Sequence, residues 1–175
     1  PWIPETSYPN LPEYPYDFGI EREVTVLKTG QDSYNWQVED FEKPKEEDLI
    51  IYEVLIRDFD SERTFQNLID RIDYFKDLNI NAIELMPVME YEGNESWGYN
   101  TAFHMSVDKF YGPEEKLKEF IDLCHQNGIA VIFDLVMNHV MGRSPMNRMW
   151  MNDPDGNGWG EPSEESPYFN EIATH

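Results

Sequence analysis

The chain has 175 residues, and its 35 acidic side chains outnumber 13 basic ones, which gives a formal charge of −22. This charge argues against nucleic acid as a partner, because affinity for nucleic acid depends on Lys and Arg contacts to phosphate. It also disfavours an anionic membrane surface, and no apolar run reaches the roughly 20 residues of a membrane-spanning helix. A single cysteine excludes an internal disulfide bond.

Residues 1–44 differ in composition from the rest of the chain. They are rich in Pro and Tyr as far as Tyr16, and a short β-like run follows at Val24–Leu27. A turn-prone stretch, 29–33, comes next, because Gly, Asp and Ser favour turns. This pattern is typical of a linker, with or without a final strand ahead of it.

From residue 49 onward, apolar strands alternate with amphipathic helices. A strand is expected at 49–56, and Thr64 then caps a helix that is predicted to continue to Leu78. The apolar residues of this helix recur on one face: Phe65, Leu68, Ile69, Ile72, Phe75 and Leu78. A short second strand at 82–86 ends at Pro87, which cannot donate a hydrogen bond to a neighbouring strand.

A long loop leads to a second helix, which is expected to start at Pro113 with acidic residues in its first turn. Its inner stripe is Leu117, Phe120, Ile121 and Cys124, and Asn127-Gly128 ends it. A third strand follows at 129–133, and its β-branched, apolar sequence predicts burial on both faces. The order strand–helix–strand–helix–strand predicts an α/β fold with a parallel sheet and right-handed crossovers.

Polar side chains follow the third strand at once. Asp134, Asn138 and His139 lie within six positions of each other. Because α/β folds bind ligands at the carboxyl ends of their strands, these residues predict a functional site there.

The run from Asp134 to His139 resembles the first signature region of the α-amylase family of glycoside hydrolases. Further segments agree with that family in order and spacing, namely 52–54 with 57–59, 83–88, and 96–100 followed by 110–112 and 124–129. The resemblance covers roughly Asp48 to Ser144. Four motifs in the right order carry more weight than any one alone.

This resemblance implies the first three β/α units of a (β/α)₈ TIM barrel. Residues 45–139 would hold barrel strands 1–3 with helices 1–2, residues 1–44 the end of an N-terminal β-sandwich module and a linker, and residues 140–175 the start of the inserted loop domain, domain B. A complete barrel takes about 250 residues, and three parallel strands cannot close. We therefore expect the front part of a larger enzyme that requires the remainder of the barrel.

The resemblance also implies which chemistry this chain lacks. The nucleophilic Asp, the general-acid Glu and a second supporting Asp of the family lie on later strands, so we expect no catalytic residue here and predict that the isolated chain is inactive. Glu53 and Glu84 are interpreted as internal polar contacts of the barrel.

The remaining roles are implied in the same way. Tyr99 resembles the aromatic residue that stacks beneath the sugar and bonds an active-site carboxylate, although a core tyrosine would also fit. His139 resembles an imidazole that donates to a sugar hydroxyl, and its alternative is a structural histidine. Asp134 would orient the site by pairing with an arginine on the next strand. Without that arginine, a carboxylate in an apolar strand is expected to lack its partner and to leave the site unformed.

Calcium is the one cofactor that the resemblance suggests. Asn138 corresponds to a residue that often gives an oxygen to a structural Ca²⁺, and members without the ion keep it as well. The oxygen-rich loop 152–158 is interpreted as a solvated turn, because loop position 12 is Ser163 and not the bidentate Glu of a calcium loop.

The predicted function is hydrolysis of α-glucans by a retaining mechanism. Glucan branching or transfer by the same family, or a non-catalytic amylase-like binding subunit, are the alternatives. An extracytoplasmic location rests on family analogy alone.

Overall fold

The computed structural model describes residues 11–15, 26–93 and 95–170. At its centre is a parallel three-stranded sheet, in the order β1 (Ile51–Val54), β2 (Ala82–Leu85) and β5 (Ala130–Phe133). In the register, Ile51 lies opposite Ala82, and Ala82 lies opposite Ala130. The predicted α/β arrangement with a parallel sheet is confirmed.

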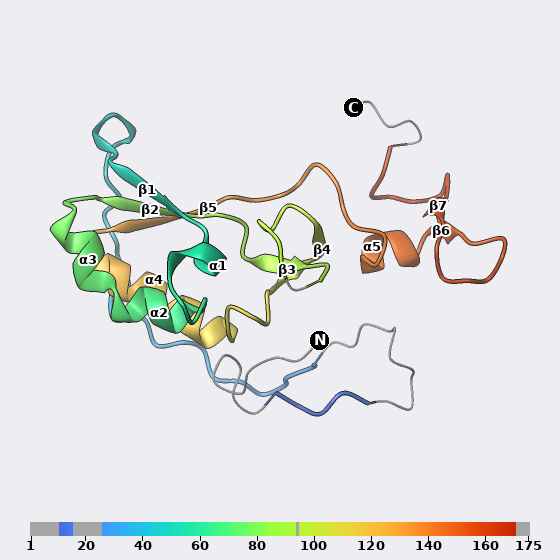
Figure 1. The fold of residues 1–175 in the computed structure, drawn as a ribbon, viewed down its shortest axis with the longest axis horizontal. Coiled ribbons are helices and arrows are strands. Elements are labelled where there is room, and N and C mark those ends of the chain that lie inside the picture. The colour runs from blue at the N-terminus through green and yellow to red at the C-terminus, as the bar shows by residue number, and fades with distance from the viewer. Residues whose placement is uncertain (1–10, 16–25, 94, 171–175) are drawn as a thin grey trace.

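Helices cover one face of this sheet (Figure 1). They are α2 (Phe65–Asp70), α3 (Ile72–Asp77) and α4 (Glu114–Gln126). The prediction of one continuous helix from Thr64 to Leu78 is wrong, since the helix breaks at Arg71. The backbone of Arg71, at φ −102° and ψ 13°, leaves the helical region and ends α2.

The ends of the helices follow the sequence signals. Thr64 and Asn67 form a capping box, in which the Thr64 hydroxyl accepts from the Asn67 N–H at 3.4 Å and the Asn67 side chain accepts from the Thr64 N–H at 3.3 Å. Helix α4 begins directly after Pro113 and ends before Asn127. Gly128 follows with a φ of 73°, the left-handed conformation that glycine adopts at low cost.

The hydrophobic core lies between the sheet and these helices. The strands contribute Val54, Ile83 and Leu85, and the helices contribute Phe65, Leu68, Phe75, Leu117, Phe120 and Cys124. This packing fixes the sheet against the helices and leaves the carboxyl ends of the strands at one edge.

No described helix or strand packs on the opposite face of the sheet. Ile51 is 46% exposed, and Glu53 beside it is exposed too. The prediction that the third strand is buried on both faces is therefore wrong. Strand β5 pairs with β2 alone among the described strands, and Phe133 at its end remains 37% exposed.

Two short helices flank the first strand, η2 (Glu46–Asp48) before it and α1 (Ile56–Phe59) after it. The region predicted as a long loop contains an antiparallel pair, β3 (Met89–Tyr91) and β4 (Thr101–Val107). The chain after β5 forms α5 (Pro145–Arg148), β6 (Met151–Asn152) and β7 (Glu161–Pro162). These last elements lie at the far end of the molecule from the sheet, with β3 and β4 between them (Figure 1).

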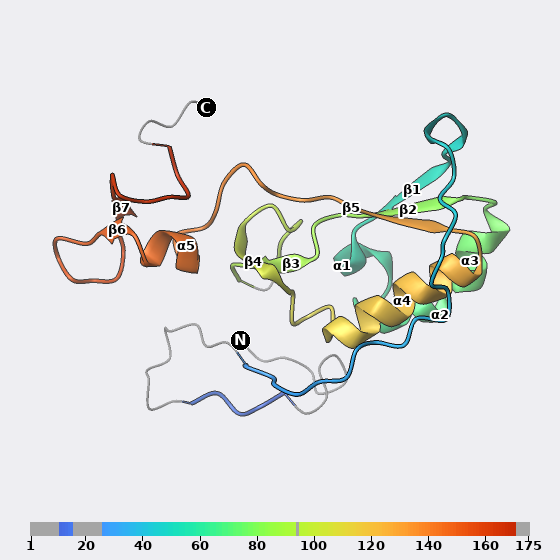
Figure 2. The same cartoon turned by 180° about the vertical axis from the view of Figure 1, so that it is seen from behind.

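Residues 34–41, the strap, run along helix α4 (Figure 2). Buried Asp122 of α4 accepts hydrogen bonds from the backbone N–H groups of Gln37 and Val38, at 3.0 to 3.1 Å. The β-like run Val24–Leu27 lies partly outside the described residues, and its described part is not a strand. None of the helices in the described parts of the chain is long and apolar enough to span a membrane.

Candidate active site

The site is built where β5 ends and where the chain turns into β4. Asp134 directly follows β5, and its N–H donates to the Leu85 carbonyl at 3.0 Å, which continues the alignment with β2. Tyr99 lies two residues before β4, and its hydroxyl donates to Asp134 Oδ2 at 2.5 Å. Residues 35 positions apart in sequence thus meet at the carboxyl edge of the sheet.

A glycine turn brings Tyr99 to this edge. Gly98 has a φ of 95°, and a Cβ atom at this position would lie 2.4 Å from the Pro87 carbonyl oxygen. The Gly98 N–H donates to the Ser96 hydroxyl at 2.8 Å, which closes the turn. Only glycine fits both the backbone conformation and the contact with Pro87. The turn 96–98 therefore sets the position of the Tyr99 backbone, from which the ring extends.

The electrostatic surroundings keep the Tyr99 hydroxyl protonated. Its pKa is raised to about 12, mainly by the hydrogen bond to Asp134, with further contributions from burial and from the charges of Asp134, Glu53 and Glu84. The two glutamates lie opposite each other in the β1–β2 register. They share the uncovered face of the sheet, where the barrel interpretation expects internal polar contacts.

His139 contacts the same tyrosine through its backbone. Nε2 of His139 donates to the Tyr99 carbonyl oxygen at 2.6 Å, which requires the hydrogen to be on Nε2. Nδ1 then accepts from the Asn138 side-chain nitrogen at 3.4 Å. Both ring nitrogens have protein partners, so the predicted bond to a sugar hydroxyl requires the sugar to replace the Tyr99 carbonyl.

Asp134 has a partner inside this chain, contrary to the expectation for a chain without the family's arginine. Among the described residues its side chain pairs with the Tyr99 hydroxyl. The carboxylate is half-buried, the Tyr99 ring is 40% exposed and His139 is exposed. The three residues form a polar wall with an open aromatic ring, which is suited to contact a ligand.

His104 belongs to this region and was missed by the sequence analysis. It lies on β4, and its Nε2 donates to the Val136 carbonyl oxygen at 2.9 Å. A single histidine between apolar and polar neighbours carries no periodic or motif signal, so only the fold reveals its contact with the segment after β5.

Calcium at Asn138 stays a prediction from the family resemblance. The residues that the structure describes include no group of three or more His, Cys, Asp or Glu that could hold an ion, around Asn138 or elsewhere. In the loop 152–158, the Asp153 carboxylate accepts from the N–H groups of Asn157 and Gly158 at 3.0 and 2.8 Å. That loop is a turn closed by its own aspartate, in line with the interpretation of a solvated turn.

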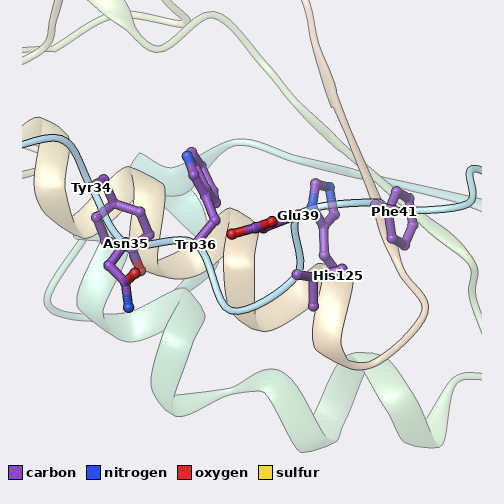
Figure 3. Close-up of a pocket in the computed structure, with 7 residues that line it drawn as sticks. Tyr34, Asn35, Trp36, Glu39, Phe41 and His125 are labelled. Carbon is purple, nitrogen blue, oxygen red and sulfur yellow. The ribbon is translucent and has the colours of Figure 1, made fainter.

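A separate hollow of about 450 Å³ lies between the strap and helix α4 (Figure 3). Its aromatic rings are paired with one another. Tyr34 meets Trp36 edge to face at 4.8 Å, and Phe41 stacks on His125 at 4.0 Å. These contacts seat the strap on the helix, away from the strand ends that carry Asp134.

Comparison with known proteins defines the class. Residues 51–166, more than half of the chain, match the family model described as the alpha amylase catalytic domain. The chain therefore belongs to the alpha-amylase family of glycoside hydrolases, and the resemblance drawn from its motifs is confirmed.

Individual relatives cover most of this chain with a small part of their own length. A malto-oligosyltrehalose trehalohydrolase from Saccharolobus solfataricus is 39% identical over 107 residues, which are 61% of this chain and 19% of that protein. A 1,4-alpha-glucan branching enzyme GlgB from Halothermothrix orenii is 32% identical over 174 residues, 91% of this chain and 27% of the enzyme. This chain thus spans about a fifth to a quarter of the length of these relatives.

The fold agrees with solved structures of the family. A crystal structure from Salmonella typhimurium, assigned as an alpha amylase, superimposes with a TM-score of 0.65 at 27% identity. The match covers 79% of this chain and 24% of that one. Similar structures are TIM-barrel amylases, which supports the α/β class inferred from the strand order.

Proposed function

We propose that this chain is the front part of a glycoside hydrolase that acts on α-glucans with retention of configuration. Strands β1, β2 and β5 would be the first three of a (β/α)₈ barrel. The observation that carries the proposal is the hydrogen bond between Tyr99 and Asp134, with His139 on the same tyrosine, at the carboxyl edge of a parallel sheet. Barrel enzymes place their active sites at this edge.

The names of relatives support the substrate class. They refer to malto-oligosyltrehalose, 1,4-alpha-glucan and cyclomaltodextrin, all of them α-glucans or derivatives of α-glucans. A neutral polysaccharide is also compatible with a chain of formal charge −22, since sugars carry no charge to repel.

The division of labour follows from the chemistry. A retaining glycosidase needs two carboxyl groups about 5–5.5 Å apart on either side of the scissile bond. In this proposal they lie on later strands, and the present chain supplies the wall of the sugar site. The Tyr99 ring would stack beneath the sugar, His139 would donate to a sugar hydroxyl, and Asp134 would orient the wall.

Exposed apolar side chains support the need for the remainder of the barrel. Leu135 is 58% exposed, Met137 is 77% exposed and Met105 on β4 is 99% exposed. The outer edges of β1 and β5 pair with no other described strand, which leaves their backbone N–H and C=O groups without a strand partner. Further strands and helices of a barrel would cover both features.

Transfer between glucan chains is the second candidate. The branching enzyme aligns with 91% of this chain, more than the trehalohydrolase does, and a sugar-binding wall serves hydrolysis and transfer alike.

Calcium remains a prediction only. Asn138 would give one oxygen, and further oxygen ligands would have to join it, because Ca²⁺ takes six to eight.

The test uses the protein with its complete barrel and, separately, the 175-residue chain. With soluble starch, the complete protein is expected to release new reducing ends, whereas a branching enzyme would form new branch points without them. The 175-residue chain is expected to do neither. Turnover by this chain alone would contradict the division of labour, and a complete protein inert on all α-glucans would contradict the proposed function.

A further inference from the structure

We propose that His104 is a positioning residue, which holds the segment 134–139 in place and thereby sets the geometry of Asp134 and His139. This inference rests on the proposed function as far as catalysis is concerned. The underlying hydrogen bond is a property of the fold and can be tested independently.

The segment after β5 lies along the chain around β4 and is bonded to it at several points. At one end, Asp134 and His139 contact Tyr99. Further along, the N–H of Met141 donates to the Thr101 carbonyl oxygen at 2.9 Å. Between Asp134 and His139, the Val136 carbonyl oxygen accepts from His104 Nε2 at 2.9 Å. His104 is the side chain that ties the middle of the segment to β4.

The chemistry of this contact fixes the state of the imidazole. A carbonyl oxygen only accepts hydrogen bonds, so Nε2 of His104 must carry the hydrogen. The other nitrogen, Nδ1, is buried and has no hydrogen-bond partner among the residues that the structure describes. The ring is therefore held through the one bond to Val136, and no second polar contact of the imidazole competes with that bond.

Val136 is an effective place to hold the segment. It is only 6% exposed, so loss of the donor would leave its carbonyl group poorly placed to find a replacement in water. It lies two residues after Asp134 and three before His139. A shift of the Val136 peptide would be passed to both residues, and a displacement of about 1 Å in a catalytic site can lower the rate about 100-fold.

The test compares His104→Leu with His104→Gln in the protein with its complete barrel. Leucine removes the donor, whereas the side-chain nitrogen of glutamine can reach about where Nε2 lies and donate to the same carbonyl. His104→Leu is expected to lower kcat on maltoheptaose about 10- to 100-fold while KM changes less than about threefold. His104→Gln is expected to recover kcat to within about threefold of the original protein.

Two further measurements separate positioning from general stability. Hydrogen exchange of the amides in 134–141 is expected to become faster in His104→Leu and to stay unchanged in His104→Gln. His125→Leu, which changes a histidine on α4 beneath the strap, serves as the control and is expected to leave exchange in 134–141 and kcat unchanged.

Each outcome either supports or overturns the proposed role of His104. Equal kcat for the leucine and glutamine variants, or unchanged exchange in 134–141 for His104→Leu, would overturn the proposal, and loss of kcat with recovery by glutamine would support it. If the unaltered protein has no activity on α-glucans, the proposed function fails. The exchange comparison then still decides whether His104 holds the segment.

Discussion

Asp122 gives the sharpest quantitative prediction, because one buried carboxylate holds the strap on helix α4. Its side chain is 2% exposed and accepts from the N–H groups of Gln37 and Val38 at 3.0 to 3.1 Å. Hydrogen bonds to charged groups contribute about 1.5–3 kcal/mol each. Taking the lower value for two donors in a partly exposed strap, Asp122→Ala costs about 3 kcal/mol in the free energy of strap docking.

The loss of free energy of strap docking can be measured as faster hydrogen exchange of the strap amides. At about 1.4 kcal/mol per factor of ten, the protection of the Gln37 and Val38 amides is expected to fall about 100-fold. Because the strap contributes no residue to the hydrophobic core, we expect it to detach locally, and the melting temperature is expected to change less than local protection does. Hydrogen exchange with mass spectrometry on peptides that cover 34–41 measures the effect directly.

A matched control is a carboxylate on the surface of α3. Asp73 pairs with Lys76 at 2.9 Å but is 83% exposed, and such pairs contribute little to stability. Asp73→Ala is therefore expected to leave the strap protected. If the strap of Asp122→Ala exchanges as slowly as that of Asp73→Ala, the carboxylate does not hold it and the reasoning is refuted.

Three further predictions concern the site and the core. Tyr99→Phe keeps the ring and removes the hydrogen bond to Asp134, so kcat/KM on maltoheptaose in the complete protein is expected to fall about tenfold, and an unchanged value would count against the proposed wall. Gly98→Ala is expected to destabilise the protein by more than about 1 kcal/mol in urea unfolding, since the added Cβ would meet the Pro87 carbonyl at 2.4 Å and the φ is 95°. Burial, followed by the charge of Glu90, raises the pKa of Asp108 from 3.8 to about 7, so its stabilising contribution is present below about pH 4 and is lost as the pH rises through about 7. Relative to Asp108→Asn, the free energy of unfolding should fall across that range, and parallel urea-unfolding profiles for the two proteins would contradict this prediction.

Local signals in the sequence were sufficient for the regular part of the fold. The apolar repeat from Phe65 to Phe75 identified a helical face, and the Thr64 cap marked its start. The glycine after Asn127 marked the end of α4. The parallel direction of the strands followed from the alternation of these elements, because parallel strands need long crossovers. Such features depend on neighbours in sequence, so a single sequence contains them.

Features that depend on distant contacts could not be predicted in this way. The pair β3–β4 lies in a stretch whose register shifts at Glu90, and irregular pairing gives no alternating pattern. The break at Arg71 interrupts an apolar repeat that by itself favours one helix. Burial of the third strand was overestimated because apolar composition shows what a strand can bury and not which partners are present to bury it.

The candidate site combines both kinds of information. Asp134 and His139 were found from a local motif, but the bond of Asp134 to Tyr99 joins segments 35 residues apart. An unpartnered carboxylate in an apolar strand is costly, and that cost motivated the expectation of an arginine from a later strand. The Tyr99 hydroxyl supplies a donor within this chain, so Asp134 does not depend on that arginine for a hydrogen-bond partner. Under the proposed function, later strands would then complete the chemistry on a wall whose aromatic ring and carboxylate already hold each other in place.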